Sequence, residues 1–202
     1  MSLKYSILGV LAARPMTGYE LSQLFSESTG WLWTASHSQI YPLLNRLVGQ
    51  GLIVGSEDVK GSNLRRTVYE LSAAGLDDLL HWVGSDHGVP KANDPFLVQA
   101  VFFDMVPPEA ARAVLQAYAT GQRDAAETAA AHAARLQVGD TPLIRERLAR
   151  RDPAEHERIK QLKSITFTGQ ADVARARAEW AERLIAALDD LDEAKNPATP
   201  RL

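Results

Sequence analysis

The stretch Ser36-His-Ser-Gln-Ile-Tyr-Pro-Leu-Leu-Asn-Arg-Leu-Val-Gly-Gln-Gly-Leu52 decides the fold of this chain of 202 residues. At about 100° per residue, its aliphatic side chains gather on one arc of a helix and its small polar side chains on the other. The aliphatic arc consists of Ile40, Leu43, Leu44 and Leu47, and the polar arc consists of Ser38, Tyr41, Pro42 and Asn45, with Gln39 and Arg46 on its shoulder. Asn, Gln and Arg can read base edges in the DNA major groove, so this face predicts a DNA-reading helix. An ordinary amphipathic helix is the alternative at this point.

Two further helices are predicted upstream. Residues 2–13 have the spacing of a helix that faces a core, with apolar side chains at Leu3, Ile7, Leu8 and Leu11. Thr17 and Glu20 match a capping box, so a second helix is predicted over residues 18–28. The third helix is predicted to start near Ser36, and Pro42 lies so deep that either its first turn is irregular or it begins later. Three short helices, the third with a polar face, are typical of helix-turn-helix organisation.

A basic hairpin is predicted directly after the third helix. Residues 52–54 form an apolar run and residues 67–71 alternate as a strand does, with a polar segment between them. That segment contains Lys60, Arg65 and Arg66, which are expected to contact backbone phosphates and so position the protein without reading sequence. The alternative is a solvated hairpin whose charges only aid solubility.

Five stretches follow one another in a specific order and spacing: Tyr5-Ser-Ile-Leu-Gly-Val-Leu11, Thr17-Gly-Tyr-Glu-Leu21, Ser36-x-x-Gln-Ile-Tyr-Pro-Leu-Leu-Asn-Arg-Leu47, Gly51-Leu-Ile53 and Arg66-Thr-Val-Tyr-Glu-Leu-Ser-Ala-Ala-Gly75. On these stretches, residues 3–83 resemble the PadR family of transcriptional regulators. The remainder resembles the longer PadR type, whose C-terminal helical domain pairs two subunits. The segment Asp94-Pro-Phe-Leu-Val-Gln-Ala-Val-Phe-Phe103 and the helix around Trp180 carry that second part of the resemblance.

The resemblance implies a mainly α fold with two domains. An N-terminal winged helix-turn-helix with a two-stranded β wing is expected over residues 1–85, and an all-α dimerisation domain over residues 86–202. The implied function is that of a bacterial, sequence-specific DNA-binding regulator, a ligand-responsive repressor that acts as a homodimer on a palindromic operator. The alternative is a winged-helix protein-interaction module that does not bind DNA.

The candidate DNA-binding residues come from the second helix, the third helix and the wing. They are Tyr19, Ser36, Ser38, Gln39, Tyr41, Asn45, Arg46, Lys60, Arg65 and Arg66. By the resemblance, Gln39 and Tyr41 lie in the groove-facing helix, and Tyr19 lies against the DNA backbone. Ser38-Gln39 stands where relatives often carry glycine and a small residue, which leaves the operator sequence open.

The overall charge argues against general DNA coating. Residues 1–85 hold six Lys and Arg against seven Asp and Glu, and residues 86–202 hold 16 against 18, which gives the net charge of −3. Nucleic-acid binders usually show a basic footprint. Modest, salt-sensitive affinity is therefore expected, with a local positive patch that a dimer would double.

The second half is predicted to be helical over residues 94–105, over residues 109–136 and from Pro153 onward, and Asp140 or Thr141 is expected to cap a further short helix. The last helix carries a stripe of large apolar residues at intervals of seven, four and three. This stripe is predicted to lie in the homodimer interface, with intramolecular core as the alternative. Its members are Val173, Trp180, Leu184, Leu188 and Leu191.

A small hydrophobic or aromatic effector is the second expected partner, after double-stranded DNA. The candidate pocket residues are Trp33, Trp82, Phe96 and Phe103, although clustered aromatic rings are more often plain core. The five histidines are scattered and the chain has no cysteine, so no catalytic group, metal or cofactor is expected, and the chain is not expected to be an enzyme. Because no signal peptide and no bilayer-spanning run is recognisable, a cytoplasmic location is expected.

Overall fold

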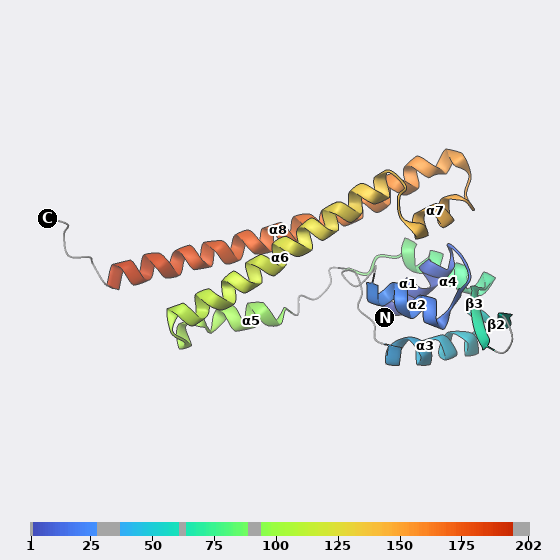
Figure 1. Cartoon of the computed structure of the whole chain (residues 1–202), viewed down its shortest axis with the longest axis horizontal. Coiled ribbons are helices and arrows are strands. Elements are labelled where there is room, and N and C mark those ends of the chain that lie inside the picture. The colour runs from blue at the N-terminus through green and yellow to red at the C-terminus, as the bar shows by residue number, and fades with distance from the viewer. Residues whose placement is uncertain (1, 28–36, 61–63, 89–93, 196–202) are drawn as a thin grey trace. The chain divides into compact units, whose positions relative to one another are not determined.

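The computed structural model in Figure 1 describes residues 2–27, 37–60, 64–88 and 94–195. It divides the chain into two compact units. Unit 1 consists of residues 1–88 and 139–160, and unit 2 of residues 89–138 and 161–202. This division differs from the predicted single boundary after residue 85, because the chain returns to the first unit after its longest alanine-rich helix.

Unit 1 is a winged helix-turn-helix, which confirms the predicted fold class. Its elements are α1 (Ser2–Leu11), β1 (Met16–Thr17), α2 (Gly18–Glu27), α3 (His37–Gly49), β2 (Ile53–Lys60), β3 (Leu64–Leu71), α4 (Ala73–Gly84) and α7 (Pro142–Leu148). The helix α3 contains Pro42 and runs through it without a break. A proline removes one backbone donor from a helix, and α3 accommodates that loss within its first half.

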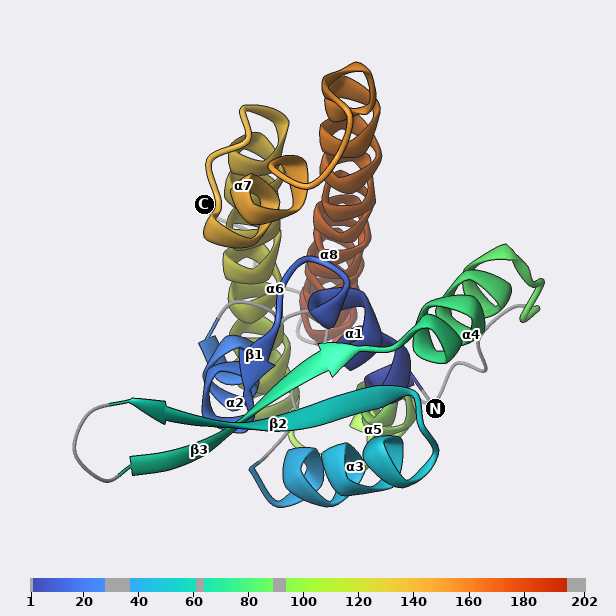
Figure 2. The ribbon, with the colours of Figure 1, turned by 90° about the vertical axis from the view of Figure 1, so that its right-hand side faces the viewer.

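The sheet of unit 1 has three antiparallel strands in the order β1-β3-β2. The strands β2 and β3 pair from Ile53 opposite Leu71 to Lys60 opposite Leu64, and Figure 2 shows them as a long hairpin. They extend through most of the segment that the sequence pattern assigned to a polar loop. The difference arises because this part of the hairpin has no apolar alternation, so no period marks it as a strand. The strand β1 is only two residues long and was not predicted.

The core of unit 1 is built from large side chains of its helices and of β2. The side chains exposed by less than 2% are those of Ile7, Leu8, Leu21, Phe25, Ile40, Leu44, Leu47 and Ile53, besides others in the chain. Leu143 of α7 packs against the same cluster, which explains why residues 139–160 belong to this unit.

The corner after α3 is fixed to the start of α4. Gly51 adopts a φ of 69°, in the left-handed region that glycine tolerates. The hydroxyl of Ser72 donates to the Gly51 carbonyl at 2.7 Å and accepts from the Gly75 amide at 2.9 Å, which caps α4. A Cβ on Gly75 would lie 1.9 Å from the Leu52 carbonyl oxygen, so only glycine fits there.

Unit 2 contains α5 (Pro95–Val101), the 3₁₀ turn η1 (Phe103–Met105), α6 (Pro108–Gln137) and most of α8 (Pro153–Lys195). The helices α6 and α8 lie side by side in Figures 1 and 2, and Ser164 of α8 donates to the Ala133 carbonyl of α6 at 3.0 Å. Their buried residues are mostly alanine, which lets the two backbones approach closely. These alanines are Ala111, Ala119, Ala126, Ala129, Ala133, Ala171, Ala174, Ala178 and Ala181.

None of the helices in the described ranges combines the length and the hydropathy that a membrane crossing requires.

Candidate nucleic-acid interface

The predicted capping box forms at the start of α2 and sets the position of Tyr19. The Thr17 amide donates to Oε2 of Glu20 at 2.8 Å, and the Glu20 amide donates to Oγ1 of Thr17 at 3.1 Å. Partial burial raises the pKa of Glu20, but the hydrogen bonds from Thr17 and Arg14 outweigh it and hold this pKa below the usual 4.5. The first turn of α2 is therefore fixed by a carboxylate that stays ionised.

Arg14 ties this capping box to α7 within unit 1. Its Nη1 donates to Oε1 of Glu20 at 3.1 Å, and its Nε lies 2.7 Å from Oε2 of Glu146. Arg147, one residue further along α7, donates to the Gly9 carbonyl of α1 at 3.4 Å. The sequence analysis missed this link, and no local pattern signals it, because its members are separated by more than 100 residues.

Tyr41 of α3 packs over the first residue of α2. A Cβ placed on Gly18 would lie 2.7 Å from Cε1 of Tyr41, so the ring occupies the space that a side chain would need. Burial raises the pKa of Tyr69 on β3, and the neighbouring Tyr41 raises it further. These contacts join α2, α3 and the wing strand β3 at one place.

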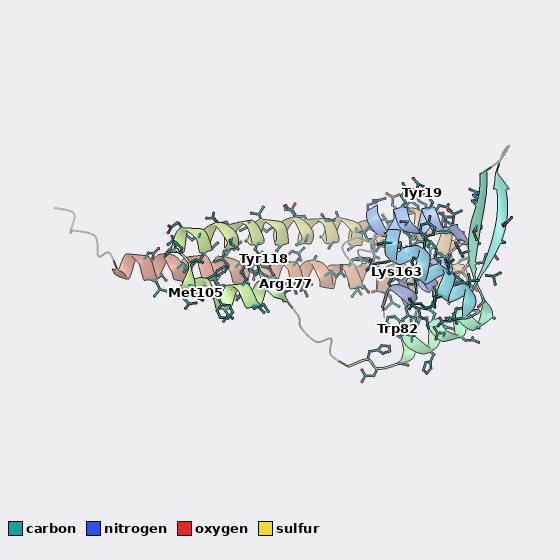
Figure 3. All side chains as sticks on the ribbon, turned by 90° about the horizontal axis from the view of Figure 1, so that it is seen from below. Tyr19, Trp82, Met105, Tyr118, Lys163 and Arg177 are labelled. Carbon is teal, nitrogen blue, oxygen red and sulfur yellow. The ribbon has the colours of Figure 1, made fainter. Side chains whose placement is uncertain are left out.

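A groove of about 470 Å³ opens at this junction. Its walls include Tyr19 from α2, Tyr41 from α3 and Arg66 from β3, together with Thr17, Gly18, Glu20, Thr67 and Tyr69. Tyr19 is 64% exposed, and Figure 3 shows it pointing outward from unit 1. Three of the predicted DNA-binding side chains, which are far apart in the sequence and include one cation, thus share one accessible surface.

A second groove, of about 560 Å³, opens along α3. Ser38, Gln39 and Arg46 line the second groove on the side of α3, together with Pro42, Leu43, Leu47 and Gln50 of the same helix and Leu3, Lys4 and Tyr5 of α1. Ser38, Gln39, Asn45 and Arg46 are all exposed, whereas Ile40, Leu44 and Leu47 are buried. The amphipathic pattern inferred from the sequence is therefore the pattern of the folded helix.

Three of the predicted DNA-binding side chains lie outside the part of the chain that the structure describes. Lys60 ends β2 and Arg65 pairs with Val59, but the side chains of both lie outside the described part, and so does Ser36 entirely. Of the predicted wing cations, Arg66 is the one whose exposed side chain the structure places.

The candidate effector residues fall into two groups. Trp82 of α4 belongs to unit 1, where it stacks on Tyr5 with 4.4 Å between ring centroids. Phe96 and Phe103 belong to unit 2, where Phe96 stacks on Tyr118 at 3.6 Å. Trp33 lies outside the described residues. That these rings line one effector pocket stays a prediction.

The stripe on α8 divides into packed and exposed members. Trp180, Leu184 and Leu188 pack within unit 2 against Leu115 and its neighbours, whereas Val173 and Leu191 are exposed. The middle of the stripe is therefore intramolecular core, which was the alternative to the predicted dimer interface.

Comparison with known proteins finds a family match within the first part of the chain. Residues 7–80 match the transcriptional regulator PadR-like family. The negative transcriptional regulator PadR of Bacillus subtilis (strain 168) is 36% identical over 101 residues, which are 50% of this chain and 56% of that protein. The chain spans about half the length of the curated relatives it matches.

Two crystal structures of Bacillus subtilis PadR share the fold over nearly the whole chain. The structure in complex with operator DNA has a TM-score of 0.68 at 24% identity and covers 93% of this chain and 99% of that one. The structure in complex with p-coumaric acid has a TM-score of 0.64 at 23% identity and covers 93% and 95%.

Proposed function

Because residues 7–80 match the transcriptional regulator PadR-like family, we propose that the chain is a regulator of this kind, which binds double-stranded operator DNA through unit 1 and acts as a ligand-responsive repressor. The observation that carries the proposal is that Tyr19, Tyr41 and Arg66, from α2, α3 and β3, line the same groove. The names of the relatives describe regulators, and the chain is accordingly not an enzyme.

The exposed side chains of α3 read the sequence. In this proposal α3 enters the major groove, where the amide groups of Gln39 and Asn45 and the guanidinium of Arg46 contact base edges. Ser36 and Ser38, at the start of the helix, donate hydrogen bonds to the adjacent backbone. All of these residues except Ser36 have exposed side chains in the described part of α3.

The residues around the groove position the protein on the sugar-phosphate backbone. Tyr19 at the start of α2 and Arg66 on β3 contact phosphates next to the base-reading helix, and Lys60 and Arg65 extend the contact along the wing. Glu20 also lines the groove, and the bonds of its carboxylate to Thr17 and to the guanidinium of Arg14 compensate part of its negative charge there.

The regulator acts as a homodimer on a palindromic operator. One α3 helix covers one half-site, and two helices related by a two-fold axis match two half-sites about one turn of DNA apart. A small hydrophobic or aromatic effector releases the operator by favouring a dimer whose α3 helices have another spacing. The complex of Bacillus subtilis PadR with p-coumaric acid supports this class of effector, for which Trp33, Trp82, Phe96 and Phe103 remain the candidates.

A titration of the DNA upstream of the chain's own gene, followed by fluorescence anisotropy at two salt concentrations, tests the proposal. Affinity should fall steeply with salt, with a slope of about −0.9 in log affinity against log salt for each phosphate neutralised. The pair R65A/R66A should weaken binding to all sequences alike and reduce that slope by about two. Q39A should instead change which sequence is preferred.

The matched control is R175A, which removes one exposed cation from unit 2 and should leave DNA affinity unchanged. Absence of salt-sensitive binding to any promoter fragment would contradict the proposal. It would favour the protein-interaction module, with which the slight excess of acidic residues in residues 1–85 also agrees.

A further inference from the structure

The guanidinium of Arg14 lies between two carboxylates that are far apart in the sequence, those of Glu20 and Glu146. Nη1 of Arg14 donates to Oε1 of Glu20 at 3.1 Å and also to the Pro15 carbonyl at 3.1 Å. Nε of Arg14 is buried and lies 2.7 Å from Oε2 of Glu146, in an ion pair without an aligned hydrogen bond. The orientation of this planar group therefore depends on both carboxylates. We call Glu20, Arg14 and Glu146 the Arg14 network.

The helix α7 gives Glu146 a fixed position in unit 1. Ile144 is almost completely buried, and Leu143 packs against the core of the unit. Arg147 donates to the Gly9 carbonyl of α1 at 3.4 Å. Because these anchors lie on both sides of Glu146 in one short helix, its carboxylate reaches Arg14 from a rigid base.

At its other end the Arg14 network reaches the groove between α2, α3 and β3. Oε2 of Glu20 accepts from the amide of Thr17 at 2.8 Å and from its hydroxyl at 2.9 Å. Thr17 in turn pairs with Val68 of β3. Tyr19, whose exposed ring Figure 3 shows, lies between Thr17 and Glu20 in the sequence, so the backbone that carries it is held on both sides. Thr17, Tyr19 and Glu20 all line the groove.

We propose that Arg14 and Glu146 are positioning residues of the DNA interface, which hold Tyr19 through Glu20 where it meets a phosphate. The inference rests on the proposed function and extends the binding machinery to residues 139–160. The family match ends at residue 80 and so does not include Glu146. Neither Arg14 nor Glu146 is among the described residues that line the groove, so both act through Glu20.

A simple charge effect of Glu146 would have the opposite sign. Loss of an anion near a DNA-binding surface strengthens the attraction to phosphates. If Glu146 positions Arg14, its loss weakens binding instead, because the first turn of α2 and Tyr19 are held less firmly. The direction of the change in affinity therefore separates positioning from general electrostatics.

Glu146 and Glu155 provide a matched test. Each is a glutamate of unit 1 paired with an arginine, and their side chains are 38% and 39% exposed, but the partner of Glu155 is Arg151. Fluorescence anisotropy with the duplex from the upstream region should show that E146Q binds about threefold to fivefold more weakly than the wild type, the range of a partly exposed ion pair. E155Q should bind at least as tightly as the wild type. The salt slope should be the same in E146Q, because no cation that contacts phosphate is lost.

Double variants test whether Glu146 acts through Arg14 and on Tyr19. R14M should weaken binding about tenfold, because it also removes the cation beside Glu20 in the groove. R14K keeps a cation there and should recover part of this loss. R14M/E146Q and Y19A/E146Q should bind no more weakly than R14M and Y19A, as residues of one network do. Additive losses would overturn the inference, because Glu146 would then act independently.

Circular dichroism should show that each variant is folded at the temperature of the binding assay. Wild-type or tighter binding by E146Q would overturn the inference and leave the proposed function standing. A lower melting temperature of E146Q together with wild-type affinity would overturn it as well, because Glu146 would then contribute to stability alone. A wild type without salt-sensitive binding to DNA would overturn the proposed function, and this inference with it.

Discussion

The two units bury different kinds of side chain. Unit 1 closes a core of leucine, isoleucine and phenylalanine, in which Phe25, Ile40 and Leu44 are almost completely buried. In unit 2 most buried residues are alanine, while Val101 and Met105 lie outside at more than 70% exposure. Burial of large apolar side chains is the main favourable term in folding. Unit 1 therefore contains its own source of stability, whereas unit 2 leaves several of its large apolar side chains exposed.

The exposed surfaces of the two units differ in the same way, and so do the partners that suit them. Unit 1 presents polar side chains and a cation around a groove, a surface suited to a charged duplex. Unit 2 presents an apolar face, a surface suited to a second protein.

The largest expected effect is in the core of unit 1. L44A removes a completely buried side chain of α3 and should lower the free energy of unfolding by about 3 kcal/mol. In unit 2 the reverse change is the harmful one, because A171L forces extra volume into a completely buried alanine position and should cost about 1–3 kcal/mol. Urea unfolding followed by circular dichroism measures both values. A harmless A171L would show that α6 and α8 are not closely packed.

Replacing one glycine in each unit by alanine should change stability in opposite directions. G75A places a Cβ 1.9 Å from the Leu52 carbonyl of unit 1 and should destabilise the chain by about 2–3 kcal/mol. Gly121 lies in the middle of α6, and a Cβ added there would meet no atom within 4 Å, so G121A should stabilise by about 0.5–1 kcal/mol. Thermal unfolding followed by circular dichroism should show a lower melting temperature for G75A and a higher one for G121A. Equal destabilisation by both would contradict the contrast between the corner and the open helix.

A smaller effect distinguishes the binding surface from the core of unit 1. In G18A the new Cβ meets the ring of Tyr41 at 2.7 Å, and the ring can rotate away because it is partly exposed. Stability should fall by about 1 kcal/mol, while DNA affinity should fall by about tenfold because Tyr41 leaves the groove. The control G9A, at an open position in α1, should change neither property by as much. Unchanged DNA affinity in G18A would remove Tyr41 from the interface.

The smallest expected effect is the acid sensitivity of the capping box. The pKa of Glu20 is lowered in the folded state, so its stabilising contribution is present above the unfolded value near 4.5 and is lost as the pH falls through the folded value. E20Q should lower stability at neutral pH and flatten its decline below pH 4.5. E179Q changes an exposed glutamate of α8 and should leave the profile as it is. If the stability of E20Q fell with pH below 4.5 as steeply as that of the wild type, Glu20 would not be the source of the acid sensitivity.

The sequence was most informative where a local rule applied. The capping box of Thr17 and Glu20 and the two faces of α3 depend on residues within one or two turns, and both formed as predicted. The cap of α7 was predicted at Asp140 or Thr141, and it is Thr141. The fold class followed from these elements and from the resemblance to the PadR family.

Contacts between residues far apart in the sequence could not be predicted from these local rules. The return of α7 to unit 1 depends on Leu143 and on the link from Arg14 to Glu146, which no periodicity encodes. The stripe on α8 had the spacing of a helix seam, but a pattern of apolar residues does not say which partner covers it. In the structure, Trp180 packs edge-to-face against the rings of Phe96 and Tyr118 of the same chain.

Sedimentation velocity of a labelled duplex from the upstream region, titrated with the full chain, tests most directly whether unit 1 reads DNA while unit 2 joins two copies. The account predicts a complex of two chains per duplex whose formation weakens as salt rises. A duplex that sediments at its own rate at every chain concentration, or that carries one chain at saturation, would contradict it.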